Sequence, residues 1–508
     1  MKIFLMYPDR DFDAEGPVPP NASDLSEDLG LSVLCDAMAD GDSLVGNVAR
    51  QALLRGLGDM DTIRYRQAVL QDALQHPSTV RDLYRVAVSA IEGEKKTYLG
   101  LFSHYPGAIL MQSITVLERY LGLFAQLRQM AETHASHFCS QGFTRLFAMV
   151  HEELSEAYLA QVQSQLRELQ FVSGVWASAE LGQGLQGIHY RLHRKPESRR
   201  PRWIQRITGQ PSAGYAFTVA ERDESGARAL SELKDRTMEK VAATLAESVD
   251  QILHFFTQLR VELAFYVGCL NLRDRLDAKG EPLCFPDPCP SDAHRHDFQG
   301  LYNVTLALTT KDQVVGTTAH ADQKALIIIT GANQGGKSTF LRSIGLAQLM
   351  MQCGMFVPAE RFRANICGSL FTHFRREEDA SLKHGKLDEE LRRMSDIVDH
   401  LRPRSMVLFN ESFAATNERE GSEIARQILS ALLEKQMKVF FVTHLYELAR
   451  GFFDHHLAPV VFLRAEREAS GARTFNIRQG APLPTSYGED LYHKIFASDE
   501  NASQPASP

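Results

Sequence analysis

The stretch that decides the fold is Ala325–Thr339, ALIIITGANQGGKST. An apolar run ends at Gly331, and the residues from Gly331 to Ser338 fit the phosphate-loop pattern G-x-x-x-x-G-K-[ST] at every fixed position. Glycines let backbone N–H groups turn toward phosphate oxygens, and a helix beginning at Ser338 adds a positive N-terminal potential. The sequence therefore predicts a strand, a phosphate-binding loop and a helix in succession.

The loop residues have distinct expected roles. Lys337 would reach the β- and γ-phosphates of a nucleoside triphosphate, and the hydroxyl of Ser338 would ligate Mg²⁺. The other expected phosphate contacts within the motif are Gly331, Ala332, Asn333, Gln334, Gly335 and Gly336. This segment predicts a protein that binds a nucleoside triphosphate.

Two further apolar strands are expected after the loop, SMVLFN (405–410) and KVFFVTH (438–444), each separated from its neighbours by amphipathic helices. Such an alternation predicts a mostly parallel sheet covered on both faces. Polar residues follow the first of these strands, where phosphoryl-transfer ATPases carry an acid for Mg²⁺ and then one that orients water.

Glu411 fits the water-orienting role, but Asn410 stands where the metal-holding acid is expected. An amide brings no charge to offset Mg²⁺, so weaker metal binding or slower turnover is predicted. The alternative is that Asn410 merely ends a strand. His444 occupies the position of a γ-phosphate sensor, although a lone histidine after a strand is also compatible with a structural role.

The rest of the chain suggests several further regions. Residues 1–40 are rich in Pro, Asp and Gly and are expected to be irregular. Residues 41–278 have apolar side chains at helical spacing over long stretches, which predicts extended helices packed as a lever. Glycines, prolines and alternation interrupt them at about 172–222. A Pro-rich linker opens the α/β domain, 279–496, and the polar tail 497–508 is expected to be disordered.

Composition places the chain among ordinary soluble proteins. The 508 residues include 55 Lys and Arg against 63 Asp and Glu, a net charge of −8, so contact with nucleic acid requires a local basic patch. No apolar window long enough to cross a bilayer is expected, and the N-terminus turns acidic too early for a secretory signal. Seven scattered cysteines suggest reduced thiols and a cytoplasmic protein.

Longer motifs resemble the MutS family of DNA mismatch-repair ATPases. TGANQGGKSTFLRSIGLAQLMMQCGMFVPAE (330–360) is similar to the family's loop, helix and Gly-x-x-VPA element. NESFAATNEREG (410–421) stands in the place of its D-E-x-G-x-G-T signature, and Thr443-His444 with Glu447-Leu448 resembles its T-H-x-x-E-L. Weaker similarities are Phe371-Thr372 before Asp379, Tyr487-Gly488, and the start of a helical core at 62–67.

The resemblance implies a multidomain α and α/β protein: a long-helix core or lever domain with a clamp-like insertion, then a P-loop ABC-type ATPase domain. It implies that Gly331–Thr339 binds ATP, that Ser338 and Asn410 serve Mg²⁺, and that Glu411 polarises water. Thr416 and Asn417 stand where the family presents hydroxyls to the γ-phosphate of a partner subunit, which implies a homodimer. Phe413 and Ala415 replace the signature glycines, and Asn417 replaces its serine.

A basic segment lies within the expected insertion and resembles the family's DNA clamp in position. It comprises Arg191, Arg194, Lys195, Arg199, Arg200, Arg202 and Arg206, with a single acid, Glu197, among them. Sequence-independent, salt-sensitive contact with duplex or branched DNA is expected here, and a solvated loop is the alternative. About 40 residues precede the helical core, and no Phe-x-Glu wedge occurs near the start, so mismatch reading in the usual way is not expected.

Other patterns have simpler interpretations. Cys284, Cys289, His294 and His296 have poor spacing for a zinc site. The acids 388–390 suit the N-terminus of an amphipathic helix. The expected function is an ATP-dependent DNA-binding protein of repair or recombination. A nucleotide-responsive scaffold with negligible hydrolysis, or a small-molecule kinase on the same loop, are the alternatives.

Overall fold

A computed structural model describes residues 1–97, 106–170, 176–181, 187–193, 224–376, 385–468 and 473–483. The chain divides into two compact units. The helical unit comprises Met1–Ile3, Arg81–Phe138 and Phe143–Arg260, and the α/β unit comprises Phe4–Val80, Cys139–Gly142 and Val261–Pro508. The combination of helical and α/β structure predicted from the sequence is confirmed.

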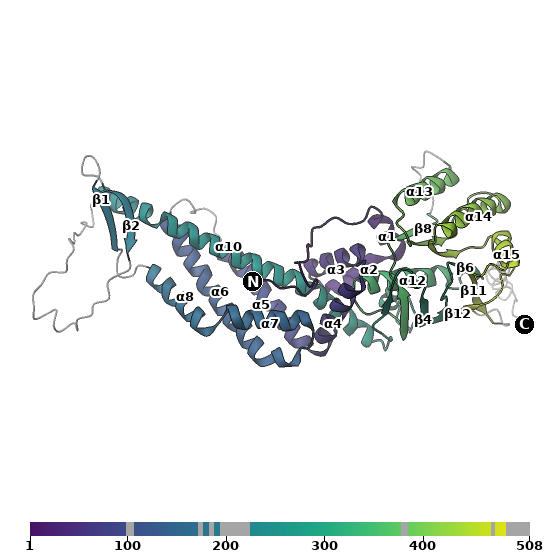
Figure 1. Cartoon of the computed structure of the whole chain (residues 1–508), viewed down its shortest axis with the longest axis horizontal. Helices are drawn as coiled ribbons and strands as arrows, with labels where there is room; N and C mark the ends of the chain where they lie inside the picture. Colours follow the sequence, from purple (N-terminus) through teal and green to yellow (C-terminus); the bar gives the residue numbers. More distant parts are fainter. Residues whose placement is uncertain are drawn as a thin grey trace, which may run out of the picture. The chain divides into compact units, whose positions relative to one another are not determined.

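The α/β unit contains a six-stranded sheet of order β12-β11-β6-β10-β9-β8 (Figure 1). Strands β11, β6, β10, β9 and β8 are parallel to their neighbours, and β12 is antiparallel to β11. The strands are β6 (Leu326–Gly331), β8 (Leu370–Phe374), β9 (Met406–Asn410), β10 (Lys438–Val442), β11 (Val460–Arg467) and β12 (Arg473–Gln479). This is the mostly parallel sheet that the sequence predicts.

Helices cover both faces of this sheet because its central strands are apolar on both sides. On one face Ile328, Phe409 and Phe441 form a buried cluster with residues of α13 (Lys386–His400), α14 (Glu418–Glu434) and α15 (Tyr446–Asp454). On the other, α12 (Lys337–Gln352) packs against β6, β9 and β10. The helix that follows the phosphate-loop motif is therefore buried almost along its whole length.

A second, four-stranded sheet of order β3-β7-β4-β5 completes the α/β unit. Its strands are β3 (Asp287–Cys289), β4 (His296–Leu301), β5 (Thr317–His320) and β7 (Arg361–Asn365), and α11 (Val304–Thr309) connects β4 to β5. This connection brings the segment between Leu301 and Thr317 beside the loop that follows β6.

Residues 1–40 differ from the predicted irregular segment, because they include α1 (Ala22–Leu29) and α2 (Leu31–Ala39). Gly30 separates them in the left-handed conformation, with a φ of 68°. Leu29, Leu34 and Met38 are fully buried, so apolar burial overrides the local Pro and Gly content. α3 (Ser43–Arg55) and α4 (Met60–Gln75) follow and contact α12 and β3 respectively. These contacts place residues 41–80, predicted as part of the helical domain, in the α/β unit.

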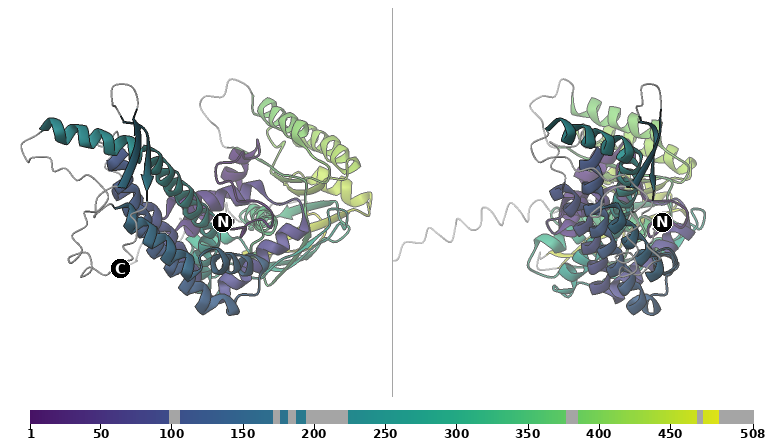
Figure 2. Two further views of the ribbon diagram at one scale, coloured as in Figure 1. Left: turned by 60° about the vertical axis from the view of Figure 1, so that its left-hand side comes forward. Right: turned by 90° about the vertical axis from the view of Figure 1, so that its left-hand side faces the viewer.

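Long helices build the helical unit, as the sequence predicts (Figures 1 and 2). Phe124 of α6 contacts Phe255 and Phe256 of α10, at ring-centroid distances of 6.1 and 5.3 Å. The helices are α5 (Pro77–Thr97), α6 (Pro106–His134), α7 (Gln141–Glu153), α8 (Glu156–Leu169) and the 54-residue α10 (Glu224–Asp277), with a 3₁₀ turn η1 (Ala135–His137). α10 contributes residues to both units.

An antiparallel hairpin of β1 (Trp176–Leu181) and β2 (Gly187–His193) precedes α10. It falls inside the predicted insertion, 172–222, where the sequence shows alternation in place of helical periodicity. The remainder of that insertion and the predicted disordered tail, 497–508, lie outside the described residues.

One helix in the described part of the chain, Pro106–His137, is by length and composition apolar enough to cross a membrane. The prediction that no such stretch exists is therefore wrong for this helix. Its apolar window is 44% buried, and Tyr120 and Phe124 contact Phe256. Packing inside the helical unit accounts for the buried apolar side chains of this helix, such as Tyr120 and Phe124.

Candidate nucleotide-binding site

The loop between β6 and α12 has the backbone geometry of its motif. Gly331 and Gly336 have φ values of 114° and 86°, a region that residues with a Cβ rarely adopt. A Cβ on Gly331 would also lie 2.9 Å from the backbone nitrogen of Ala465 on β11. Both glycines are therefore required by the turn itself, which ends where Gly336 caps α12.

Lys337 begins α12 and is 4% exposed. Its ammonium group donates hydrogen bonds to the carbonyl oxygens of Gly331 and Ala332, at 3.0 and 2.9 Å. Burial lowers the pKa of Lys337, the nearby Arg473 lowers it further, and Glu411 opposes both effects. The carbonyl groups of the loop thus bind the desolvated ammonium group of Lys337. Phosphate oxygens, which carry negative charge, would form stronger hydrogen bonds with this group than the carbonyl oxygens do.

Ser338 and Asn410, the two predicted Mg²⁺-serving residues, lie together. The hydroxyl of Ser338 donates to the amide oxygen of Asn410 at 2.8 Å. Ser338 belongs to the first turn of α12 and Asn410 is the last residue of β9, so the packing of α12 on the sheet creates this pair. Oxygen donors of this kind suit Mg²⁺, although the pair carries no negative charge.

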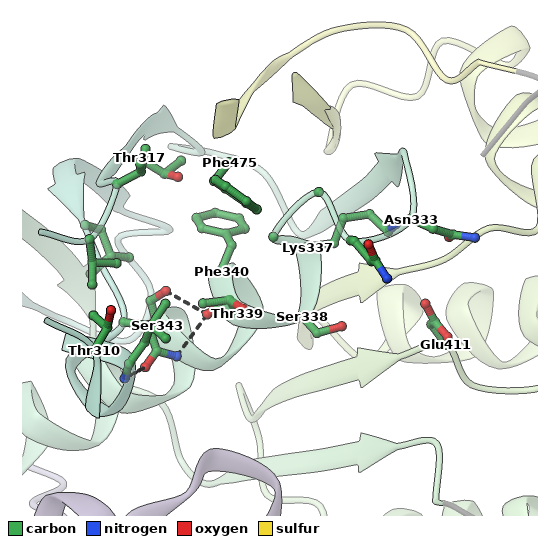
Figure 3. Close-up of a pocket in the computed structure, with 18 of the residues that line it drawn as sticks. Thr310, Thr317, Asn333, Lys337, Ser338, Thr339, Phe340, Ser343, Glu411 and Phe475 are labelled. Atoms are coloured by element: carbon green, nitrogen blue, oxygen red, sulfur yellow. Dashed lines mark hydrogen bonds between the residues drawn. The ribbon is translucent and has the colours of Figure 1, made fainter. Parts of the chain in front are cut away.

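Glu411, labelled in Figure 3, faces the same cavity as the loop, and His444 also lines that cavity. Glu411 follows β9 with a φ of 55°, and its backbone N–H donates to the carbonyl oxygen of Val442 at 2.9 Å. That bond ties the end of β9 to the end of β10, two residues before His444. Among the described residues that line the cavity, Glu411 is the one carboxylate.

The turn after Glu411 is held by buried side chains that the sequence does not assign to a site. Phe413, which replaces a signature glycine, is fully buried with a φ of 62°. Its backbone N–H donates to Glu390 Oε2 at 2.7 Å, and its ring stacks on His373 with centroids 5.3 Å apart. Glu390 therefore supports this turn, whereas Asp388 and Glu389 are the helix-terminal acids that the sequence predicts.

His373 is fixed between the two sides of this turn. Its Nδ1 lies 2.7 Å from the hydroxyl of Ser412, and its Nε2 lies 3.0 Å from the carbonyl oxygen of Glu390. Because a carbonyl only accepts, Nε2 carries the proton; the hydroxyl of Ser412 donates to the carbonyl oxygen of His373 at 2.6 Å and lies beside the unprotonated Nδ1. Burial, with a smaller effect of Arg393, lowers the pKa of His373 to about 4. The imidazole is therefore neutral at physiological pH.

Thr416 and Asn417 lie at the N-terminus of α14, as the motif predicts. Asn417 is the N-cap residue, and its side-chain oxygen accepts from the backbone N–H of Glu420 at 3.0 Å. The hydroxyl of Thr416 donates to the carboxylate of Glu420. Nothing in the single chain tests their predicted action on a partner subunit.

The cavity has a volume of about 770 Å³ and brings the loop residues Asn333 to Thr339 together with Glu411 and His444. Residues that the sequence analysis did not select form its other wall. Phe475 of β12 lies beside Phe340 in Figure 3, on the side of Lys337 away from Glu411. The segment between β4 and β5 adds Leu306, Val314 and Val315. These apolar groups suit a planar base, but they come from distant segments and carry no motif.

Two arginines add positive charge near the loop. Arg375, which follows β8, lines the cavity, and Arg473 of β12 donates from Nε to the carbonyl oxygen of Asn333 at 3.3 Å. Lys337 and Arg375 thus give the cavity more cations than its single described carboxylate, as expected for an anionic ligand.

Several predicted residues are not brought into a described site. Arg191 lies on β2, while Arg194, Lys195, Arg199, Arg200, Arg202 and Arg206 lie outside the described residues, as do Asp379, Tyr487 and Gly488. His296 is fully buried among the rings of Phe298, Phe362 and Phe440, and burial holds its pKa well below the ordinary value. It is a core residue.

Comparison with known proteins gives matches in both parts of the chain. Residues 58–279 match the family model of the MutS2 N-terminal domain, and residues 327–494 match that of MutS domain V. MutS protein homolog 4 of Mus musculus is 29% identical over 243 residues, which are 46% of this chain and 24% of that protein. The DNA mismatch repair protein MutS of Porphyromonas gingivalis is 36% identical over 172 residues, 31% of this chain and 19% of its own length.

The DNA mismatch repair protein MutS of Leptospira interrogans (serovar copenhageni) is 26% identical over 275 residues. This region is 51% of the present chain and 31% of that relative, so the chain spans less than a third of the length of these curated relatives. The matches nevertheless include both the helical region and the region of the phosphate-loop motif. The predicted resemblance is therefore confirmed, and the chain is MutS-like, a relative of the DNA mismatch-repair ATPase family.

Proposed function

We propose that this protein is a MutS-like ATPase that binds DNA, with ATP binding and hydrolysis coupled to movement of its long helices on DNA during repair or recombination. The observation that carries the proposal is the convergence of Lys337, Ser338 and Glu411 on one cavity, with Asn410 hydrogen-bonded to Ser338. Lys337 and Ser338 come from the phosphate-loop motif, whereas Asn410 and Glu411 come from the end of β9, and the fold brings these two segments together.

ATP would bind with its phosphates against the loop and its base toward Phe475 and Phe340. The ammonium of Lys337 would exchange its carbonyl partners for β- and γ-phosphate oxygens, because a charged acceptor makes the stronger hydrogen bond. The N-terminus of α12 contributes further positive potential at the same place. Arg375 adds positive charge to the lining of the cavity, and Arg473 lies beside the loop at the carbonyl oxygen of Asn333.

Ser338 and Asn410 would hold Mg²⁺ together with phosphate oxygens. When bound, Mg²⁺ neutralises charge on the phosphates. Ser338 would rotate its hydroxyl from Asn410 toward the metal, and the amide oxygen of Asn410 would accept from a metal-bound water. Because Asn410 adds no charge, slow turnover is part of the proposal.

Glu411 would accept a proton from the water that attacks the γ-phosphorus, and its position is fixed by its backbone bond to Val442. His444 would contact the γ-phosphate from the adjacent strand end. Two chains would face each other so that Thr416 and Asn417 of one reach the nucleotide of the other. In that arrangement the hydroxyl of Thr416 must leave the carboxylate of Glu420, which it contacts in the single chain.

The basic segment 191–206 would contact the DNA backbone. The whole chain has a net charge of −8, whereas this segment concentrates positive charge and is therefore the part of the sequence expected to attract DNA phosphates. Contact with phosphates is independent of base sequence. Duplex affinity should fall steeply with salt for the wild type. A variant with these charges neutralised should bind weakly and with a shallower salt dependence, and equal binding by both would contradict this part of the proposal.

A nucleotide-responsive scaffold with negligible hydrolysis is the second candidate. The uncharged pair of Ser338 and Asn410 favours it, since a metal site without a carboxylate suits retention of nucleotide better than rapid turnover. Both candidates require ATP binding, but only the first requires hydrolysis that depends on Glu411.

The decisive experiment is equilibrium titration of the full chain with ATP and Mg²⁺. Replacing Lys337 by Ala should raise the Kd for ATP by about 30-fold or more, because a buried charged hydrogen-bond donor is lost. Lys435→Ala, on an exposed lysine after α14, is the matched control and should bind as the wild type does. Unchanged affinity in Lys337→Ala would refute the proposed site.

A further inference from the structure

Residues 4–12 form an irregular segment, without helix or strand, that is held by contacts within the α/β unit. Leu5 and Met6 are fully buried, and Phe12 is 2% exposed. The backbone N–H groups of all three residues donate to one carboxylate, that of Glu262 on α10, at 2.5 Å for Leu5, 3.0 Å for Met6 and 2.9 Å for Phe12. One side chain of the long helix therefore closes a loop in this segment.

Glu262 is itself fully buried. Its burial raises its pKa to about 7, against the opposing effect of the three N–H donors. A buried carboxyl group without hydrogen-bond partners would be strongly destabilising, so the segment and the helix depend on each other. This makes the contact specific to residues 4–12.

The carbonyl groups of the same segment are also held. Tyr65 of α4 donates from its hydroxyl to Phe4, and Tyr266 of α10 donates to Leu5. Arg66 of α4 donates from Nε to the carbonyl oxygen of Met6 at 3.1 Å. The segment is thus bonded along both of its polar edges, to α10 and to α4.

Arg66 connects this segment to the helix of the nucleotide site. It is 1% exposed, and its guanidinium also donates to the carbonyl oxygen of Cys353, the C-cap residue of α12, at 2.9 Å. A cation at the C-terminus of a helix is favoured by the helix dipole. The next residue, Gly354, has a φ of 81°, and a Cβ there would lie 2.8 Å from Cβ of Arg66. The glycine permits this close approach.

These bonds form a continuous path. α12 begins at Lys337 in the phosphate loop and ends at Cys353, about 24 Å away for a helix of this length. From Cys353 the path continues through the guanidinium of Arg66 to the carbonyl oxygen of Met6. It then passes along the backbone to Leu5, whose N–H group is bonded to Glu262 of α10. Because α12 is buried and helices are stiff along their axis, a shift at the loop reaches Arg66 without being absorbed by solvent-exposed side chains.

We propose that residues 4–12 act as a coupling strap that transmits the nucleotide state of the phosphate loop from α12 to α10, and so sets the DNA affinity of the helical unit. The inference rests on the proposed function, and it assigns Arg66, Glu262 and Tyr266 as positioning residues. They touch neither nucleotide nor DNA in this assignment.

The test uses the full chain and compares the wild type with Glu262→Gln. Glutamine keeps the shape of the side chain but has only one acceptor oxygen, so it cannot accept all three N–H bonds. Glu239→Gln, on an exposed residue of the same helix, is the matched control. Tyr266→Phe removes only the hydroxyl that holds Leu5 and provides a second, milder variant.

Three quantities are measured: the Kd for the ATP analogue AMP-PNP, the Kd for a fluorescent linear duplex with and without that analogue, and hydrogen exchange of the amides of Leu5, Met6 and Phe12. In the wild type the analogue should change duplex affinity by about tenfold, within the usual range of such couplings, and change exchange of these amides. In Glu262→Gln the coupling should fall below about twofold while analogue affinity is retained. Tyr266→Phe should lie between, and Glu239→Gln should behave as the wild type.

The outcomes separate the strap from the proposed function. If the wild type binds analogue and duplex but both strap variants keep the full coupling, the strap is refuted and the proposed function stands. If the wild type fails to bind the analogue or the duplex, the proposed function fails and the strap fails with it. Should Glu262→Gln not fold, Tyr266→Phe decides by the same criterion.

Discussion

The phosphate loop, 331–339, and the turn after β9, 410–417, are neighbouring parts of one cavity that keep their backbone shape in different ways. In the loop, Gly331 and Gly336 occupy left-handed positions, as the motif requires. In the turn, Glu411 and Phe413 adopt φ values of 55° and 62° although both carry side chains. A left-handed residue with a Cβ costs about 1–2 kcal/mol, so something else must hold the turn.

Packing supplies that support. Phe413 is fully buried between Phe409 and His373, and its N–H is bonded to Glu390. The loop must leave room for a ligand, so at Gly331 and Gly336 its shape depends on residue type, whereas Phe413 faces the core and depends on its neighbours. The same conformation can therefore be specified locally by glycine or at a distance by buried contacts.

The largest expected effect is on ATP hydrolysis, which we expect to depend on Glu411 in the turn, whereas ATP binding depends on the phosphate loop. Glu411→Gln should lower steady-state ATP hydrolysis by about a hundredfold or more, because the water loses its proton acceptor, while ATP affinity stays within about twofold. Phosphate release and equilibrium titration measure the two quantities. Equal hydrolysis by wild type and variant would remove Glu411 from the chemistry, and absence of hydrolysis in the wild type would favour the scaffold.

Phe413→Gly tests whether packing or backbone strain dominates the turn. Glycine relieves about 1–2 kcal/mol of backbone strain, but loss of a buried aromatic ring costs about 3–5 kcal/mol and the extra entropy of the unfolded chain about 0.5–1 kcal/mol. Replacing Phe413 by the family's glycine should therefore lower the free energy of unfolding by about 3 kcal/mol, measured in urea. A variant as stable as the wild type would show that strain at this position outweighs the ring.

His373 makes the turn sensitive to acid. Its pKa is lowered from 6.5 to about 4 in the folded protein, so the unfolded chain binds more protons between these values. The stabilising contribution is present above about pH 6.5 and is lost as pH falls toward 4, by about 2 kcal/mol between pH 7 and 5. Urea unfolding of wild type and His373→Asn across this range measures it. Parallel pH profiles for the two proteins would exclude His373 as the cause.

The sequence predicts the loop side of the cavity better than its other walls. Strand β6, the start of α12, and the positions of Asn410, Glu411 and His444 follow from local patterns, since apolar runs and motif spacing fix them. Phe475, Arg375 and the segment between β4 and β5 have no such pattern. They reach the cavity only through strand pairing: β8 pairs with β9, β5 pairs with β4, and the hairpin of β11 and β12 pairs with β6.

The same distinction explains the N-terminal residues. Residues 1–40 contain enough Pro, Asp and Gly to predict an irregular segment, yet α1 and α2 form because Leu29, Leu34 and Met38 have a core to enter. The carboxylate of Glu262, which accepts from Leu5, Met6 and Phe12, lies 250 to 257 positions away on α10. No local pattern could have identified Glu262 as their acceptor.

Asn410→Asp sharpens the comparison by restoring a charge without changing shape. Aspartate keeps an acceptor for the hydroxyl of Ser338, so the fold should be retained. The added carboxylate should strengthen Mg²⁺ binding and lower the Mg²⁺ concentration needed for half-maximal ATPase activity by about tenfold. A Mg²⁺ titration of activity in both proteins measures this shift, and no shift would mean that Asn410 only ends its strand.

Gln334→Gly is the counterpart of Phe413→Gly within the loop. Gln334 has a φ of 58° and is exposed, so its side chain contributes little packing to offset the strain. Relief of about 1–2 kcal/mol is partly cancelled by about 0.5–1 kcal/mol of extra chain entropy in the unfolded state. The variant should therefore be more stable by about 0.5 kcal/mol in urea. If Phe413→Gly lowers the free energy of unfolding and Gln334→Gly raises it, burial of the side chain decides whether a residue other than glycine is favoured in the left-handed conformation. If both substitutions lower the free energy of unfolding, side-chain contacts also stabilise the loop.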